Sequence, residues 1–471
     1  MRRRCCVPRS SSRARSCRPW PKTTAKPRDD WPPDDRSREG RGGLNRAARP
    51  LPPDDRSREG RGGLNRAAKP LPSDDRSREG RGGLDRPARH EGEQPMTFPL
   101  PESNPEALGL DPRPLERLCA TVERHIAEGH HPGAQVAVAR HGKLAVFRSF
   151  GRSRVAPDMA ANADTLFLMY SNTKVVTAAA VWLLAEDGLL RFSDTIAQHL
   201  PEFAAHGKEQ VTVLQLLTHQ GGFPSAMVSP EIAADHDAVR RAVCNFTLEW
   251  TPGSKVRYHP TSAHWVAAML IEAITGQDFR AFIRDRVLAP IGLANEVFVG
   301  LPEAEHGRAA FIYDPPAEGA FPSRAGENHP GHWRVGVPGG GGYGTARGMA
   351  AFYQMLAQGG VLNGTRILSP RMIEFVTRDF TGDRIDEYMN LPMHRGIGPH
   401  SRGDWPVARG LGAIAHPRTF GHGGVGSSYC WADPTSGVSF AFFSNCRQTE
   451  AFHNQRMDVL SNLAHAAILP A

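Results

Sequence analysis

The chain has 471 residues, of which 40% are hydrophobic and 23% charged, a composition typical of a globular protein that is long enough to bury a core. Its net charge of +8 comes from one end: residues 1–95 hold 25 Lys and Arg against 14 Asp and Glu, whereas residues 96–471 hold 32 against 35. The basic balance therefore gives no reason to expect a nucleic-acid partner for residues 96–471.

Cysteine spacing and hydropathy exclude several further classes of protein. The segment after Arg2, Arg3 and Arg4 is not apolar, and no later run reaches the roughly 18 apolar residues of a membrane span, so we expect a cytoplasmic protein without a membrane partner. The cysteines lack the spacing of metal ligands and indicate no disulfide framework, so we expect no zinc site. They are Cys5, Cys6, Cys17, Cys119, Cys244, Cys430 and Cys446.

The first 95 residues contain a perfect repeat with a period of 20. The sequence DDRSREGRGGL occupies residues 34–44, 54–64 and 74–84. Each unit has one Leu and no aromatic residue, so stacking the units would bury almost no apolar surface. We therefore predict a disordered basic tail over residues 1–95 and a folded domain over residues 96–471.

Two interpretations of this tail remain open. It is either an RNA-binding segment built on Arg-Gly-Gly triplets or a region translated from a start codon placed too early, with Met96 as the natural beginning. RNA-binding tails usually interleave aromatic residues for stacking, and Trp20 and Trp31 both lie outside the repeats. This composition favours the misplaced start codon.

The patterns after Met96 predict helix and hairpin elements at both ends of a helical middle. They indicate an α+β fold, with an antiparallel β-sheet flanked by N- and C-terminal helices and a mostly helical second region. A cluster of glycines at 339–342 and 344 predicts a flexible loop. The expected helices are 112–128, one that starts at Ser171 and Lys174 and ends near Gly188, the apolar half of 211–223 before its Gly turn, 262–276, 279–288, 346–359 and 450–469. The expected strands are 134–139, 144–150, 428–432 and 438–444.

Ser171 and Lys174 stand at the start of the apolar stretch 167–190. In a helix, their three-residue spacing places the hydroxyl and the amine on one face. Only seven residues of the chain are Lys, and of these only Lys174 has a Ser three positions before it. A desolvated Lys can lose its proton, whereas Arg cannot. The pair is a candidate nucleophile and base; the alternative is a buried helix that Ser171 merely caps.

Four segments together resemble a known superfamily. Over about residues 100–465 the chain resembles the serine β-lactamase and penicillin-binding-protein superfamily, specifically its class C β-lactamase-like branch, which includes esterases and D-amino-acid peptidases. The resemblance implies a β-lactamase/transpeptidase-like fold of the α/β sandwich type. The four segments are the S-x-x-K match SNTK (171–174), LLTHQGGF (216–223), PGSKVRY (252–258) and FGHGGVGS (420–427).

The resemblance assigns the catalytic roles. It implies that Ser171 is the acylated nucleophile, that Lys174 activates it and that Tyr258 relays a proton to the leaving group. The positive charge of Lys174 is expected to lower the pKa of a phenol held near it. The alternative for Tyr258 is a buried aromatic residue after a turn.

The resemblance also assigns the walls of the site. It places His422, Gly423 and Gly424 on a strand that binds substrate, where small residues allow close approach. It implies an oxyanion hole made by the backbone N–H groups of Ser171 and Val425. The alternative for His422 is a turn residue without a role in binding.

Two departures from the family pattern bear on the substrate. Pro260 stands where β-lactamases have an Asn that holds a substrate amide, and His422 stands where many members have a Lys that helps bind the β-lactam carboxylate. Both departures favour an ester. We expect a serine hydrolase that works through an acyl-enzyme, a carboxylesterase on small or medium esters, and this mechanism requires no metal and no cofactor. The alternatives are a D-amino-acid peptidase or amidase, a weak β-lactamase, a non-catalytic scaffold and an RNA-binding tail.

A dinucleotide site is not expected. Gly339, Gly341 and Gly344 satisfy G-x-G-x-x-G, but Pro338 precedes them and no acidic residue stands in a convincing position for a ribose. The small-molecule partner that we expect is an ester or amide substrate.

Overall fold

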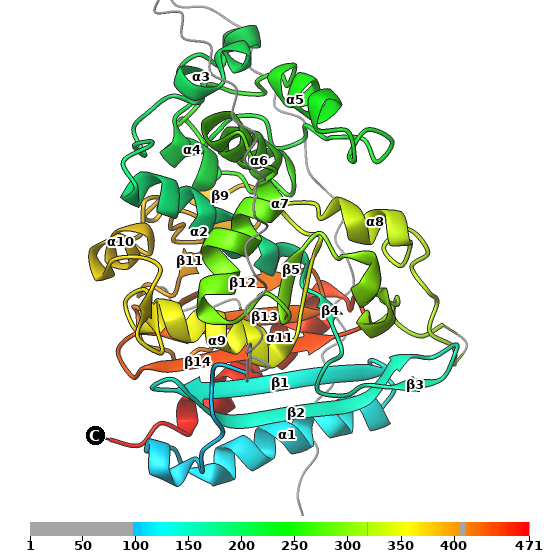
Figure 1. The fold of residues 1–471 in the computed structure, drawn as a ribbon. Helices are drawn as coiled ribbons and strands as arrows, with labels where there is room; N and C mark the ends of the chain where they lie inside the picture. Colours follow the sequence, from blue (N-terminus) through cyan, green and yellow to red (C-terminus); the bar gives the residue numbers. More distant parts are fainter. Residues whose placement is uncertain (1–97, 318, 405–409, 471) are drawn as a thin grey trace, which may run out of the picture. The chain divides into compact units, whose positions relative to one another are not determined.

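The computed structural model describes residues 98–317, 319–404 and 410–470 (Figure 1). In these ranges no helix combines the length and the apolar character that crossing a membrane requires. The basic tail and its repeats lie outside the described residues.

A seven-stranded antiparallel sheet forms the centre of the described chain, with the strand order β11-β12-β13-β14-β1-β2-β3. The first strand, β1, pairs with both β2 and β14, so the beginning and the end of the domain meet in the middle of the sheet. The strands are β1 (Gly133–Arg140), β2 (Lys143–Arg154), β3 (Met159–Ala160), β11 (His400–Ser401), β12 (Phe420–Gly424), β13 (Ser428–Asp433) and β14 (Val438–Ser444).

Helices cover both faces of this sheet because successive side chains of a strand point to opposite sides. In β1, Val136 and Val138 belong to the cluster formed with α1 and α11, whereas Ala137 and Ala139 belong to the cluster formed with α2 and α9. Figure 1 shows α1 beside β1 and β2, with the helical region on the opposite side of the sheet. These covering helices are α1 (Pro112–Ala127), α2 (Thr173–Glu186), α9 (Ala346–Ala357) and α11 (Glu450–Ala466).

Helix α2 is buried within the helical region. Every residue from Thr173 to Leu184 is buried, as expected for a helix that is apolar on all sides. It packs against α6, which is equally apolar. The other helices of the region are α3 (Ile196–His199), α4 (Val213–Leu217), α5 (His236–Cys244), α6 (Ser262–Thr275), α7 (Phe279–Phe282), α8 (Pro330–Val335) and α10 (Pro370–Val376).

The predicted α+β architecture is confirmed, but the prediction of a loop is wrong for its last three residues. Gly342–Gly344 form β6, the middle strand of a small sheet with β4 (Phe167–Leu168) and β5 (Val297–Val299). A Cβ at Gly342 would lie 2.6 Å from the Met169 side chain. Glycine is therefore used here for close packing rather than for a turn.

Candidate active site

Ser171 lies in a turn of 3₁₀-helix (Tyr170–Asn172) immediately before α2. Tyr170 has a φ of 46°, a left-handed conformation that is unfavourable for a bulky residue. Two hydrogen bonds fix the turn: Thr173 Oγ1 donates to the Tyr170 carbonyl at 2.6 Å, and Asn172 Nδ2 donates to Ser428 Oγ at 2.8 Å. The nucleophile candidate is thus held by α2 on one side and by β13 on the other.

Lys174 is fully buried one turn further on, and its Nζ lies 3.1 Å from Ser171 Oγ. Nζ donates to the carbonyls of Pro260 at 2.7 Å and Gly339 at 2.5 Å. Burial, assisted by the charge of Arg395, lowers the pKa of Lys174 well below its ordinary value. In its neutral form an amine has two N–H donors and one lone pair; with the two carbonyls accepting from the donors, the lone pair of neutral Lys174 would be left for the Ser171 hydroxyl.

Tyr258 Oη donates to Ser171 Oγ at 2.8 Å. Lys174 Nζ lies 5.0 Å from the centroid of the Tyr258 ring. The expected lowering of the Tyr258 pKa is nevertheless wrong, because burial is the largest influence and raises this pKa; the hydrogen bond with Ser171 and the charge of Arg395 lower it only in part. At neutral pH, Tyr258 is therefore a neutral phenol that can donate a proton.

Strand β12 carries His422, Gly423 and Gly424 alongside the nucleophile turn. Burial lowers the pKa of His422 well below its ordinary value, so the ring is neutral. Its Nδ1–H donates to the Gly423 carbonyl at 2.8 Å, which leaves Nε2 as an acceptor with no hydrogen-bond partner among the described residues. His422 thus offers a neutral acceptor to the cavity.

Val425 follows β12, and its side chain is 46% exposed. Both Val425 and Ser171 line one cavity of about 180 Å³. The two residues predicted to form the oxyanion hole therefore face the same space. The remaining lining residues include Tyr258, Tyr388, Met389, Met393, Arg395, His422, Gly423 and Gly424.

Comparison with known proteins identifies the family of the chain. The family model described as Beta-lactamase matches residues 118–463. The chain belongs to the beta-lactamase family. This membership confirms the resemblance that the four sequence segments indicated, and it identifies a serine hydrolase family.

Three similar proteins show how far the similarity extends. The esterase/beta-lactamase LipL of Mycobacterium tuberculosis is 27% identical over 314 residues, which cover 60% of this chain and 70% of LipL. The crystal structure of a penicillin-binding protein homologue from Caulobacter crescentus superposes with a TM-score of 0.67 at 28% identity, covering 76% of this chain and 99% of that chain. The crystal structure of a family VIII carboxylesterase superposes with a TM-score of 0.68 at 28% identity, and again covers 76% of this chain and 99% of that chain.

Two charged residues next to the candidate active site were not predicted from the sequence. Asp386 and Arg395 form a buried ion pair, with Arg395 Nη2 2.7 Å from Asp386 Oδ2, and the Arg395 guanidinium lies over the Tyr258 ring. No local spacing connects either residue with the motif that carries Tyr258. The carbonyls of Pro260 and Gly339 were also missed, because a backbone acceptor leaves no mark in the sequence.

Gly424, on β12, packs closely against the residues that lead into the nucleophile turn. A Cβ there would lie 2.5 Å from the Met169 carbonyl oxygen and 3.0 Å from the Tyr170 Cβ. We expect Gly424→Ala to lower the free energy of unfolding by about 1 to 3 kcal/mol and kcat/KM for an ester by about tenfold or more, because the turn must shift.

Chemical denaturation and ester hydrolysis measure both effects. Gly307→Ala is the matched control, since a Cβ at Gly307 meets nothing within 4 Å. We expect it to change the free energy of unfolding by less than about 0.5 kcal/mol. Wild-type activity in folded Gly424→Ala would contradict the close-approach role of Gly424.

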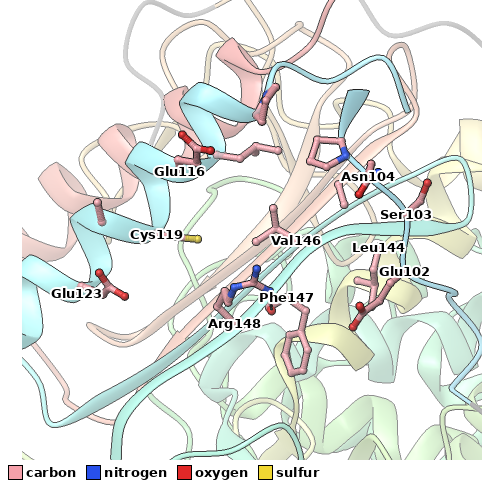
Figure 2. A pocket seen from close by; sticks show the side chains of 15 residues that line it. Glu102, Ser103, Asn104, Glu116, Cys119, Glu123, Leu144, Val146, Phe147 and Arg148 are labelled. Atoms are coloured by element: carbon pink, nitrogen blue, oxygen red, sulfur yellow. Dashed lines mark hydrogen bonds between the residues drawn. The ribbon is translucent and has the colours of Figure 1, made fainter. Parts of the chain in front are cut away.

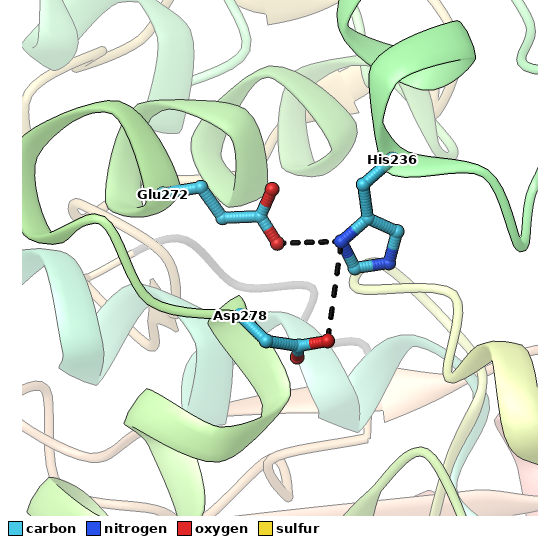
Figure 3. Close-up of side chains that lie close together, drawn as sticks. All are labelled: His236, Glu272 and Asp278. Atoms are coloured by element: carbon cyan, nitrogen blue, oxygen red, sulfur yellow. Dashed lines mark hydrogen bonds and ion pairs between the residues drawn. The ribbon is translucent and has the colours of Figure 1, made fainter.

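One cluster outside the cavity has the composition of a metal site. His236 Nδ1 lies 2.7 Å from Glu272 Oε1 and 4.0 Å from Asp278 Oδ2 (Figure 3). However, Asp278 also accepts hydrogen bonds from the Arg280 guanidinium, at 2.5 Å, and from the Arg280 and Ala281 backbone N–H groups. The carboxylates are already engaged by protein donors, so the cluster fits a hydrogen-bonded link between α5 and α6 better than a metal centre.

A second hollow, of about 740 Å³, lies between α1 and β2. Figure 2 shows Glu116, Cys119 and Glu123 extending from α1, and Arg148 on β2. Burial raises the pKa of the Cys119 thiol. Cys119 is therefore not an activated nucleophile, and none of the predicted site residues lines the hollow.

Proposed function

We propose that this protein is a carboxylesterase that hydrolyses small or medium esters through an acyl-enzyme on Ser171. The observation that carries the proposal is the position of one hydroxyl between two proton-transfer groups. Ser171 Oγ lies 3.1 Å from Lys174 Nζ and 2.8 Å from Tyr258 Oη. A nucleophile within hydrogen-bond reach of a base is the signature of covalent catalysis.

In acylation, Lys174 acts as the general base. As Ser171 Oγ bonds to the ester carbonyl carbon, its proton passes to the Lys174 lone pair and the carbonyl π electrons move to oxygen. The backbone N–H groups of Ser171 and Val425 stabilise the oxyanion. The intermediate then collapses, the bond to the alcohol oxygen breaks, and Tyr258 donates its proton to that oxygen. The Lys174 ammonium returns a proton to Tyr258, so the two groups recover their starting states.

Deacylation repeats the sequence with water as the nucleophile. Water loses a proton to the Lys174 and Tyr258 pair as its oxygen bonds to the acyl carbon, and the bond between that carbon and Ser171 Oγ breaks. The serine oxygen regains the proton, and a carboxylic acid leaves. The same two groups, Lys174 and Tyr258, carry the proton in both halves of the reaction.

The walls of the cavity favour an ester over a β-lactam or a peptide. His422 is neutral, so it provides no positive charge for a substrate carboxylate, and the charge of Arg395, which also lines the cavity, is paired with Asp386. Pro260 has no amide side chain, and its carbonyl is engaged by Lys174. The esterases among the similar proteins agree with this preference: LipL is named an esterase/beta-lactamase, and one structural neighbour is a family VIII carboxylesterase.

Three substrates assayed in parallel test the proposal. We expect p-nitrophenyl butyrate to be hydrolysed with a kcat/KM at least about 100-fold above those for D-alanine p-nitroanilide and a chromogenic cephalosporin, which would correspond to a difference of about 2.7 kcal/mol in transition-state binding. Faster cleavage of the amide would identify a D-peptidase, and faster cleavage of the cephalosporin a β-lactamase. Either result would overturn the ester preference.

Tyr258→Phe separates the role of Tyr258 in leaving-group protonation from its packing. The ring and its contact with His219, at 4.7 Å between centroids, are kept, and only the hydroxyl is lost. We expect kcat/KM for ethyl butyrate to fall by about 10² to 10³, and that for p-nitrophenyl butyrate to fall much less, because p-nitrophenolate leaves without a proton. Equal losses with the two esters would contradict the role of Tyr258 as proton donor.

A further inference from the structure

Arg395 is a buried cation beside the proton-transfer pair that the proposed function does not use. Its side chain is 1% exposed. Its guanidinium carbon lies 5.0 Å from the centroid of the Tyr258 ring, the same distance as Lys174 Nζ. Guanidinium groups stack on aromatic rings and stay charged at every accessible pH. A permanent positive charge therefore lies against the phenol that borders the nucleophile.

Asp386 holds this charge in place and also holds the chain that carries Tyr258. Oδ2 of the fully buried Asp386 carboxylate accepts from Arg395 Nε at 3.2 Å and Nη2 at 2.7 Å. Its Oδ1 accepts the backbone N–H groups of Tyr258 at 3.1 Å and Tyr388 at 3.0 Å. Because one carboxylate binds both partners, Arg395 cannot move without disturbing the Tyr258 segment.

Arg395 Nη1 has no hydrogen-bond acceptor among the described residues. A buried donor of this kind costs free energy, so its retention needs a reason beyond the ion pair. The guanidinium is shared between Asp386 on one side and the face of Tyr258 on the other. The guanidinium therefore packs on the Tyr258 ring, and its Nη1–H group is left without a hydrogen-bond acceptor among the described residues.

The groups around Tyr258 show what this charge does. Besides Ser171 and Lys174, they are Asp386, Tyr388 and the rings of His219 and His422. Burial holds the pKa values of His219 and His422 well below the ordinary value, so both rings are neutral. Asp386 carries the opposing negative charge, but it is bonded to Arg395 directly. Arg395, the positively charged member of the ion pair, is therefore the member that lies over the Tyr258 ring.

We propose that Arg395, anchored by Asp386, is a positioning residue that fixes the Tyr258 ring and supplies a permanent positive charge, which adds to burial in favouring the basic form of Lys174. A nearby cation disfavours a second proton on Lys174 and makes Tyr258 a stronger acid. Both effects favour the states in which Lys174 accepts a proton and Tyr258 donates one. This inference rests on the proposed function.

The test is the pH profile of kcat/KM for p-nitrophenyl butyrate in the full-length wild type, R395Q and R395K. Activity rises as pH passes upward through the apparent pKa of the coupled Lys174 and Tyr258 pair. Removing the positive charge raises that pKa, so we expect the acid limb of R395Q to move up by about 1 to 2 pH units. R395K keeps the charge but loses the planar fork, so its acid limb stays within about 0.3 units while kcat falls.

The readout separates a positioning role from a structural one. A purely structural Arg395 would lower activity by the same factor at every pH, and an unmoved acid limb in folded R395Q would overturn the proposal. If R395Q does not fold, D386N/R395Q tests the same charge, because the amide oxygen introduced at position 386 still accepts the backbone N–H groups and no charge is left unpaired. Its acid limb should also move up; an unmoved limb would overturn the proposal equally.

The same experiment distinguishes this inference from the function on which it rests. A wild-type protein that does not hydrolyse the ester at any pH would overturn the proposed function itself. An active wild type whose profile matches that of folded R395Q would leave the esterase proposal standing and remove only the role of Arg395.

Discussion

Replacing Lys174 by Met is expected to lower kcat/KM for p-nitrophenyl butyrate by about 10⁴-fold or more, because Ser171 then has no base within reach. Methionine has nearly the length of lysine and no charge, so the fold should survive. The substitution leaves the carbonyls of Pro260 and Gly339 without the donors that they now have at 2.7 and 2.5 Å. We therefore expect a moderate loss of stability beside the loss of activity.

Lys208→Met is the matched control for this variant. Lys208 is also fully buried, and its Nζ also donates to backbone carbonyls, those of Ala205, Cys244 and Phe246. It does not line the cavity that contains Ser171. We expect this control to lose stability but to keep kcat/KM, measured per folded molecule, within about threefold of wild type. Similar losses of activity in the two variants would show that Lys174 acts only through the fold.

Ser171→Ala is expected to lower kcat/KM for the same ester by about 10⁴-fold or more, because the proposed covalent intermediate forms on its oxygen. The change removes one atom and two hydrogen bonds, so the melting temperature should change little. Ester hydrolysis and thermal unfolding measure the two effects. Ser254→Ala, on an exposed turn, is the control and should behave as wild type. More than about 1% of wild-type activity in Ser171→Ala would require another nucleophile.

Local sequence patterns predicted those parts of the site whose geometry is itself local. Ser171 and Lys174 are three residues apart, so one turn of backbone brings them together, and the apolar run that follows makes the helix buried. The outer helices and hairpins were predictable for the same reason, since their periodicities of 3.6 and 2 are read over a few residues. Tyr258 came only from the order of the family segments.

The missed features depend on contacts that no spacing encodes. Asp386 follows Tyr258 by 128 residues in the chain. The fold brings the two together, so that the Tyr258 backbone N–H donates to the Asp386 carboxylate. The pKa of Tyr258 was predicted in the wrong direction because burial, which the sequence does not display, outweighs the hydrogen bond with Ser171 and the charge of Arg395. Gly342 looked like part of a loop because a glycine that permits close packing is indistinguishable in sequence from one that permits a turn.

The measurement that tests the central claim most directly is the mass of the intact protein after exposure to a fluorophosphonate probe, made on wild type and on Ser171→Ala. Ser171 Oγ should attack phosphorus and displace fluoride, so the account predicts one phosphonyl adduct on wild type and none on the variant. An adduct that persists in Ser171→Ala, or a folded wild type that takes up none, would contradict the assignment of Ser171 as an activated nucleophile.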